Sequence, residues 1–472
     1  GISAGDDIRI TTTGLARYGQ LVSSGLGADG EGDGGNIVLR STGTLFVDHA
    51  EAARGFTASA ASISTGPNTI ITGGDISLSA PGDIDLGNSQ AGGFITANAG
   101  GVLSFGAMTS GASSSLVAGA TLTGTSLTSG GSVSLRAGGA VTVNSLVASG
   151  TFAPAGIPAP EGNIFVISNG SAALGTLNAR ASIGVRANGV SGTGLWTAGE
   201  DIYVQSLNGA TLAAVSAGDD VQIIAANGIA LTDATARGTG RDDRNVQFNP
   251  AVLTPVGVFP ANFSLVVAPA QGADIVLTTG ASAPVNAMNL TAADDIAITG
   301  GALTLTGLAR TTGAGLNGAG SDIDVTAASA ALPDAQAFSA LRVATSGTQT
   351  LGTLTAGSLI DLGSTNGNID YAALTAGTSL ALIAANGSVS GSGAANAGTD
   401  ATLSGQSLAI GDVTAPGTLS LTGTVGAASA GALSGGSVTA SAGAPPTARH
   451  ASHRPAPAAL SPAPAMANPQ TT

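Results

Sequence analysis

The sequence predicts an all-β fold, namely a single-stranded parallel β-helix (β-solenoid) whose coils repeat about every 19–21 positions along the chain. Three observations support this class: a short acidic motif recurs at nearly constant spacing, apolar residues alternate within short segments, and glycine is abundant, with 73 in 472 residues. A unit of this length is too short for a pair of helices and too long for a hexapeptide coil. Each repeat is therefore interpreted as one coil of a few short strands.

The repeated motif consists of a small residue, glycine, one or two acids and then β-branched residues. It begins at Ala4–Ile8 and recurs at Ala198–Ile202, Ala217–Val221, Ala292–Ile296 and Gly320–Ile323. The β-branched residues that follow alternate with polar ones, which places one set inward and the other outward. No comparable helical periodicity accompanies the motif, so we expect strands throughout the repeats.

The spacing of equivalent glycines defines the repeat length. It is 19 from Gly199 to Gly218, 20 from Gly357 to Gly377 and 21 from Gly377 to Gly398. Stacked coils of this kind bury a continuous aliphatic core that no single repeat could form. We therefore expect one elongated domain, a rod, over residues 1–442.

Corners between strands require residues that can turn the chain. Asn-Gly pairs are expected to supply corners with positive φ, and they occur at Asn227-Gly228, Asn366-Gly367 and Asn386-Gly387. Paired acids at the same phase of several coils are interpreted as turn and solubilising residues, these being Asp6, Asp7, Asp219, Asp220, Asp294 and Asp295.

Three segments break the repeat and are predicted to be loop excursions, near residues 14–35, 151–161 and 237–272. From residue 443 to 472 the composition shifts to Pro and Ala without any alternating pattern. We expect this tail to be disordered or a linker. The chain does not begin with Met, and it is interpreted as a processed or excised piece of something longer.

Composition excludes several functions. The formal net charge is −14, which disfavours nucleic-acid binding, because the phosphate backbone carries the same sign. No run of about 18 apolar residues occurs, so membrane insertion is not expected. The chain has no cysteine, and all 14 of its cationic side chains are arginine, so disulfides, thiolate metal sites and lysine chemistry are excluded.

The repeated blocks, for example Ala217–Leu231 and Ala376–Val389, resemble the β-helical repeats of filamentous haemagglutinin-like and autotransporter-like exoproteins of Gram-negative bacteria. The resemblance covers most of residues 1–442, although the family's N-terminal secretion motif has no counterpart. It implies a right-handed coil and a secreted or surface-exposed rod exported through an outer-membrane translocator. It also implies adhesion to cells, matrix or other bacteria through a glycan or protein partner, and lateral self-association stays open.

A second class of function is a β-helical polysaccharide hydrolase or lyase, since such enzymes use clustered carboxylates as acid and base. An active site occurs once, however, whereas the paired acids here repeat. His49 next to Asp48 has no accompanying nucleophile motif. The sequence therefore assigns no catalytic residue.

Alternating acids at Asp29, Glu31 and Asp33 resemble the start of a Ca²⁺ loop, because oxygen ligands at alternate positions can converge on a hard cation. The closing glutamate is missing, and Arg40 stands in its place. A flexible acidic loop is the preferred interpretation, and Ca²⁺ is the one cofactor considered.

The excursion at 237–272 concentrates arginine and phenylalanine in a chain poor in both. Arginine and aromatic residues are enriched in binding surfaces. The candidate partner-binding residues are Arg237, Arg241, Arg244, Phe248, Phe259 and Phe263. The competing interpretation is that these phenylalanines pack against the rod itself.

Overall fold

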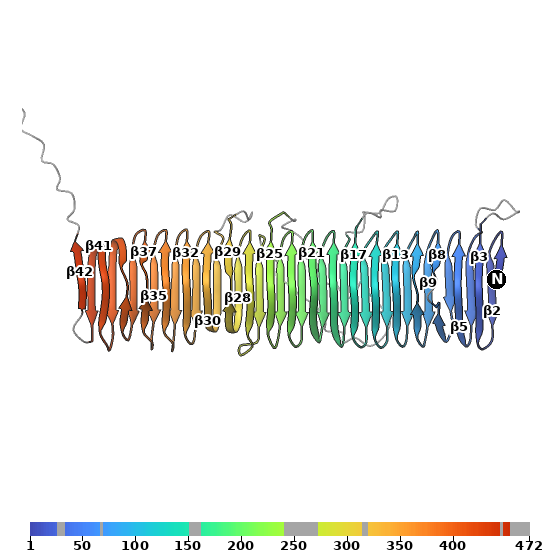
Figure 1. The fold of residues 1–472 in the computed structure, drawn as a ribbon, viewed down its shortest axis with the longest axis horizontal. Coiled ribbons are helices and arrows are strands. Elements are labelled where there is room, and N and C mark those ends of the chain that lie inside the picture. The colour runs from blue at the N-terminus through green and yellow to red at the C-terminus, as the bar shows by residue number, and fades with distance from the viewer. Residues whose placement is uncertain are drawn as a thin grey trace, which may run out of the picture. The chain divides into compact units, whose positions relative to one another are not determined.

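A computed structural model describes residues 1–25, 34–66, 69–150, 162–239, 272–313 and 320–443, and the backbone of a further strand at 447–453. The chain divides into two compact units, Gly1–Thr345 (unit 1) and Ser346–Thr472 (unit 2). Figure 1 shows arrows that follow one another as stacked coils within each unit. The described residues contain no helix, and so none that is long and apolar enough to cross a membrane.

The strands of unit 1 are β1 (Ile2–Ala4), β2 (Ile8–Thr12), β3 (Ala16–Ser23), β4 (Ile37–Ser41), β5 (Thr44–Ala52), β6 (Phe56–Ser59), β7 (Ser62–Ser64), β8 (Ile70–Thr72), β9 (Ile76–Ala80), β10 (Ile84–Leu86), β11 (Ser89–Ala91), β12 (Ile95–Ala99), β13 (Leu103–Ser110), β14 (Ser114–Ala118), β15 (Leu122–Ser129), β16 (Val133–Ala137), β17 (Val141–Ala148), β18 (Ile164–Ser168), β19 (Ser171–Ala179), β20 (Ile183–Ala187), β21 (Gly189–Ala198), β22 (Ile202–Ser206), β23 (Ala210–Ala217), β24 (Val221–Ala225), β25 (Ile229–Ala236), β26 (Ile275–Thr279), β27 (Val285–Ala292), β28 (Ile296–Leu305), β29 (Leu308–Thr311), β30 (Ile323–Ala337) and β31 (Leu341–Thr345).

The strands of unit 2 are β32 (Gln349–Ala356), β33 (Ile360–Ser364), β34 (Ile369–Ala376), β35 (Leu380–Ala384), β36 (Val389–Gly391), β37 (Ala395–Ala397), β38 (Ala401–Gly405), β39 (Leu408–Ile410), β40 (Val413–Gly423), β41 (Ala428–Ala442) and β42 (Thr447–His453).

Each coil has three faces. In unit 1, β9, β10 and β11 form the three faces of one coil. Both β10 and β11 pair with β13, a single longer strand of the next coil. We call the side that carries β9 the first face. Its strands in coil order are β2, β4, β6, β9, β12, β14, β16, β18, β20, β22, β24, β26, the start of β28, the start of β30, and β31.

The register confirms the predicted repeat length and fold class, because strands of successive coils pair in parallel. Leu103 pairs with Leu122, Gln349 with Ile369, and Leu380 with Ala401, so each partner lies one predicted repeat further along the chain. Inward positions are aliphatic and fully buried, as Ile95, Leu103 and Val133 illustrate. This buried column is the continuous core that the repeats predicted.

The parallel pairing of strands continues across two of the predicted excursions. Val133 pairs with Ile164, and Val221 pairs with Ile275. Residues 151–161 and 240–271 are thus inserted between consecutive coils, and they lie outside the described residues. The excursion predicted at 14–35 is narrower, because Ala16–Ser23 forms the regular strand β3, which pairs with β5.

The predicted tail contains one strand. β42 (Thr447–His453) pairs in parallel with β41, so backbone pairing extends past residue 443. The remaining residues of the tail, 454–472, lie outside the described part of the chain.

The explanation of the Asn-Gly corners by positive φ is right at one site and wrong at two. Gly228 has a φ of 126°, whereas Gly367 and Gly387 are not in the positive region. A Cβ on Gly387 would lie 2.0 Å from the carbonyl oxygen of Gly367, the equivalent residue of the preceding coil. Glycine is needed there because stacked corners approach too closely for a side chain.

Candidate functional site

A column of carboxylates lies at the corner that precedes the first face. Asp201, Asp220, Asp274, Asp295 and Asp322 each stand directly before a first-face strand. We call these five residues the corner ladder. The residue before a first-face strand has a backbone N–H that faces the preceding coil, and a carboxylate at the same position of that coil can accept it.

Each carboxylate of the corner ladder binds the next coil. Asp220 Oδ1 accepts the backbone N–H of Asp274 at 3.0 Å, and Asp274 Oδ1 accepts that of Asp295 at 2.9 Å. Asp295 and Asp322 continue the pattern at 2.7 and 2.8 Å, toward Asp322 and Ala340. The contact from Asp201 to the N–H of Asp220 is longer, at 3.4 Å. The ladder therefore holds successive coils together.

The same bond occurs at corners where the acceptor is neutral. Asn36 and Asn163 precede first-face strands, and their Oδ1 atoms accept the N–H of Gly55 at 3.2 Å and of Ser182 at 3.0 Å. An amide therefore performs the same structural task as the carboxylate. The negative charge is not needed for this bond.

Burial separates the corner ladder from an ordinary solvated turn. Asp201, Asp220 and Asp274 are 3%, 7% and 6% exposed, and their neighbours Asp219 and Asp294 are equally buried. The interpretation of the paired acids as turn residues is confirmed, but the solubilising role is wrong for Asp219, Asp220 and Asp294, since they do not face water. The sequence interpretation also missed Asp274, which directly follows an insertion.

Burial changes the protonation of these acids. It raises the pKa of Asp220 to about 9 and that of Asp274 to about 7, because loss of hydration penalises the charged form more than the backbone hydrogen bonds favour it. The pKa of Asp201 and that of Asp295 rise to about 6 for the same reason. Neighbouring carboxylates add repulsion in every case. At pH 7 Asp220 therefore holds its proton and Asp274 is about half protonated, whereas Asp201 and Asp295 are mostly ionised.

Three acids approach closely enough to share a cation. Carboxylate oxygens of Asp274, Asp294 and Asp295 lie within 4.8 Å of one another. Oxygen atoms are the ligands that Ca²⁺ and Mg²⁺ prefer. Asp274 and Asp295 each commit Oδ1 to a backbone N–H, and Asp294 Oδ1 accepts the hydroxyl of Ser321 at 3.0 Å. A cation would therefore have to use the other oxygens and displace protons.

The candidate Ca²⁺ residues Asp29, Glu31 and Asp33 lie outside the described residues, so that hypothesis stays a prediction.

Of the candidate partner-binding residues, Arg237 is described. Its Nε donates to the carbonyl of Ala217 at 3.2 Å, and its Nη2 reaches that of Ala198 at 3.3 Å. Arg237 thus caps the ends of two coils. The other five, Arg241, Arg244, Phe248, Phe259 and Phe263, fall outside the described part of the chain. Partner binding by this set stays a prediction.

His49, the histidine considered for catalysis, lies on β5 with its Nε2 2.9 Å from the Oε1 atom of Glu51 on the same strand. Neither the corner ladder nor Arg237 lies on β5.

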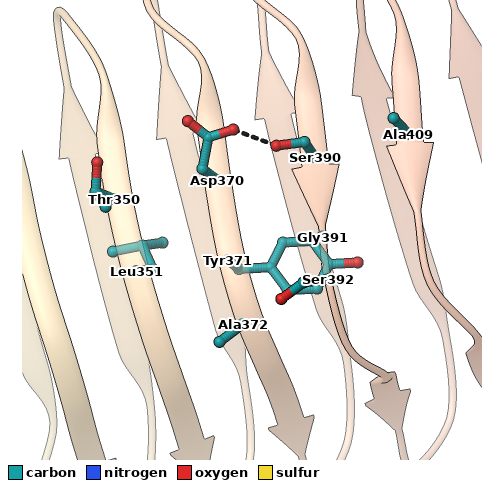
Figure 2. Close-up of a pocket in the computed structure, with 9 residues that line it drawn as sticks. All are labelled: Thr350, Leu351, Asp370, Tyr371, Ala372, Ser390, Gly391, Ser392 and Ala409. Carbon is teal, nitrogen blue, oxygen red and sulfur yellow. Dashed lines mark hydrogen bonds between the residues drawn. The ribbon is translucent and has the colours of Figure 1, made fainter.

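Unit 2 has a shallow open hollow of about 490 Å³ (Figure 2). Thr350, Asp370 and Ser390 stand on its rim in one register row across three coils, and the hydroxyl of Ser390 donates to Asp370. The volume is within the range of about 300–1,000 Å³ typical of small-molecule sites. No motif in the sequence pointed to this hollow, because its residues belong to different repeats.

Tyr371 closes the hollow from the inner side. Its ring occupies the space that a side chain on Gly391 would fill, since a Cβ there would lie 2.1 Å from the ring. Tyr371 is 4% exposed, and its hydroxyl has no hydrogen-bond partner among the described residues. Burial raises the pKa of Tyr371 to about 12. The neutral phenol therefore persists at any physiological pH.

Comparison with known proteins identifies no relative: no family model, no curated protein and no solved structure matches this chain. The structure establishes a parallel β-solenoid, which is compatible with a β-helical repeat protein.

Proposed function

We propose that the chain is a structural and adhesive rod of a bacterial exoprotein, secreted or displayed at the cell surface, that attaches to cells, matrix or other bacteria. The observation that carries the proposal is the polar rim of the hollow in unit 2. There, hydroxyl and carboxylate groups of Thr350, Asp370 and Ser390 point outward at the spacing of adjacent coils. This arrangement suits the hydroxyl groups of a surface glycan.

Repetition supports weak, multivalent contact. An outward column of small polar side chains crosses four coils of unit 2, from Thr355 through Thr375 and Asn396 to Thr414. Individually weak contacts gain strength when several act at once. The proposal also includes export through an outer-membrane translocator, which is supported by the resemblance of the repeats to filamentous haemagglutinin-like exoproteins.

The alternative, a polysaccharide hydrolase or lyase, requires an acid and a base that face a substrate. The closest carboxylate trio among the described residues, Asp274, Asp294 and Asp295, is hydrogen-bonded within the coil corners instead. The geometry of this trio does not favour the enzyme.

The test is binding of the full chain to immobilised bacterial and host glycans. A triple variant, Thr350→Ala, Asp370→Asn and Ser390→Ala, should lose at least about tenfold in apparent affinity, since each polar contact is worth about 1 kcal/mol. The matched control, Thr57→Ala with Ser77→Ala, alters exposed outward residues of unit 1 and should bind normally. Absence of binding to glycans, cells and matrix would contradict the proposal. Release of reducing ends would favour the enzyme instead.

A further inference from the structure

Tyr371 and Phe105 occupy the same position in their coils, one in each unit. Each is an inward residue, the third of an eight-residue strand, in β34 and in β13. Tyr371 pairs with Gly391 of the next coil, and a Cβ on this glycine would lie 2.1 Å from Cζ of the ring. Phe105 pairs with Gly124 in the same way, with a distance of 2.0 Å. Each ring therefore fills the space that a side chain of the next coil would take.

The hydroxyl of Tyr371 is the difference between the two rings. Phe105 is 5% exposed and Tyr371 is 4% exposed, so a ring packs at this position without a polar atom. A buried tyrosine hydroxyl usually has a hydrogen-bond partner, whereas that of Tyr371 has none among the described residues. A buried polar group without a partner lowers stability. Packing of the coil therefore does not account for the hydroxyl, and the open space that Tyr371 adjoins is the hollow of unit 2.

The lining of this hollow carries hydroxyl and carboxylate groups (Figure 2). Asp370 supplies the carboxylate, and the hydroxyls belong to Thr350, Tyr371, Ser390 and Ser392. A hydroxyl can donate and accept a hydrogen bond, whereas a carboxylate can only accept. The hydroxyl of Ser390 donates to Oδ1 of Asp370, which leaves Oδ2 to accept from a ligand. None of the lining residues is an arginine or a histidine, so the hollow offers no cation to a negatively charged ligand.

We propose that the hollow binds a neutral sugar and that Tyr371 is a specificity-determining residue of the site, because its hydroxyl gains a hydrogen-bond partner from the sugar. This inference rests on the proposed adhesive function and names the class of its ligand. Sugar hydroxyls can donate to Asp370 and accept from Tyr371. The apolar side of a sugar ring fits the apolar part of the lining, such as Leu351 and Ala372. A sugar carboxylate would meet Asp370 with the same charge, so uronic and sialic acids are disfavoured.

The free chain keeps the hydroxyl of Tyr371 closed to water. Its bond to a sugar therefore requires the ring to tilt toward the hollow, which supplies the open space for this movement. Gly391 has no side chain that would hold the ring in place. A site with a polar group to be paired rejects ligands that lack the matching group. The Tyr371 hydroxyl therefore selects a sugar that presents an acceptor to it.

The test compares the full chain with its Tyr371→Phe variant, which keeps the ring and removes the hydroxyl. The probes are immobilised neutral oligosaccharides of glucose, galactose, mannose and N-acetylglucosamine, with sialylated and glucuronate-containing oligosaccharides as acidic counterparts. The parent chain should prefer the neutral probes. The variant should bind them about five- to tenfold more weakly, as expected for the loss of one hydrogen bond. Its midpoint of urea unfolding without sugar should be equal to that of the parent or higher, because a buried unpaired group is removed.

The matched control is the reverse substitution, Phe105→Tyr, which adds the same hydroxyl at the equivalent position of unit 1. Phe105 does not line the hollow, so this variant should bind the neutral probes as the parent does. It should unfold at a lower urea concentration, because the new hydroxyl is buried at a position that already packs as a phenyl ring. Together, the two variants separate a role in sugar binding from a role in packing.

Equal binding by the parent and Tyr371→Phe would overturn the inference, and so would a lower urea midpoint of Tyr371→Phe, since the hydroxyl would then be structural. Preference for the acidic probes would overturn it as well. In these cases the adhesive function still stands if the rim variant at Thr350, Asp370 and Ser390 loses binding. Attachment to cells or matrix without binding of any sugar would overturn this inference alone, whereas absence of all attachment would contradict both.

Discussion

Two corner aspartates make the same hydrogen bond in different surroundings. Asp75 precedes β9, accepts the N–H of Phe94 at 2.8 Å and is exposed to solvent. Asp220 precedes β24, accepts the N–H of Asp274 at 3.0 Å and is buried. The local motif and the bond are shared, so they do not determine the protonation of Asp220. What differs is the burial of the two carboxylates, and the following experiments vary the burial and the charge of these corners.

The largest expected effect is a loss of stability as pH rises. An aspartate whose pKa is raised in the folded state binds its proton more tightly when folded than when unfolded. Its stabilisation is complete below the unfolded pKa of about 3.9 and is lost as pH rises through the folded pKa. That loss runs through about 6 for Asp201 and Asp295, 7 for Asp274 and 9 for Asp220.

We therefore expect the free energy of unfolding to fall between pH 5 and pH 9 by at least about 5 kcal/mol, since Asp220 alone crosses about four pKa units of this range and one unit corresponds to about 1.4 kcal/mol. Urea denaturation at each pH measures it. A stability that rises over this range would show that the corner ladder is ionised and paired in the folded chain.

Removal of the Tyr203 ring tests the burial of the first face, because this side chain of β22 is 4% exposed. Tyr203→Ala should lower the free energy of unfolding by about 3 kcal/mol, as truncation of a buried aromatic residue does. Thr57→Ala, at an exposed outward position of β6, should change it by less than about 0.5 kcal/mol. Tyr203→Phe separates the ring from the hydroxyl and should cost about 1 kcal/mol or less. Similar values for Tyr203→Ala and Thr57→Ala in urea denaturation would show that the two surroundings are equivalent.

An effect confined to one corner acid is expected from Asp220→Asn. The amide keeps an acceptor for the N–H of Asp274, as Asn36 and Asn163 do at their corners, but it removes the ionisable group. Between pH 5 and pH 9 the variant should gain up to about 5 kcal/mol in stability relative to the parent chain, because it loses no proton over this range. Asp75→Asn should be nearly neutral at both pH values. Destabilisation by Asp220→Asn at pH 9 would mean that the charge itself is needed.

The fold could be predicted because its determinants are local and repeated. The glycine spacing and the alternation around Ile202 and Val204 specify coil length and inward residues, and the register confirms both. Burial of the corner ladder could not be predicted, because the motifs at Asp7 and Asp220 are alike and only distant residues decide which one is buried. Asp274 escaped notice since an insertion separates it from its repeat, and the hollow at Asp370 is assembled from separate coils.

The most direct test compares the pH dependence of unfolding in the parent chain with that of a variant in which four buried corner acids are replaced by asparagine, namely Asp201→Asn, Asp220→Asn, Asp274→Asn and Asp295→Asn. The amides keep acceptors for the corner hydrogen bonds, as Asn36 and Asn163 do, but they cannot ionise. The fall in stability between pH 5 and pH 9 should then shrink by at least about half. An unchanged fall in a variant that keeps its β-rich circular dichroism spectrum would show that these acids do not hold their protons in the folded chain.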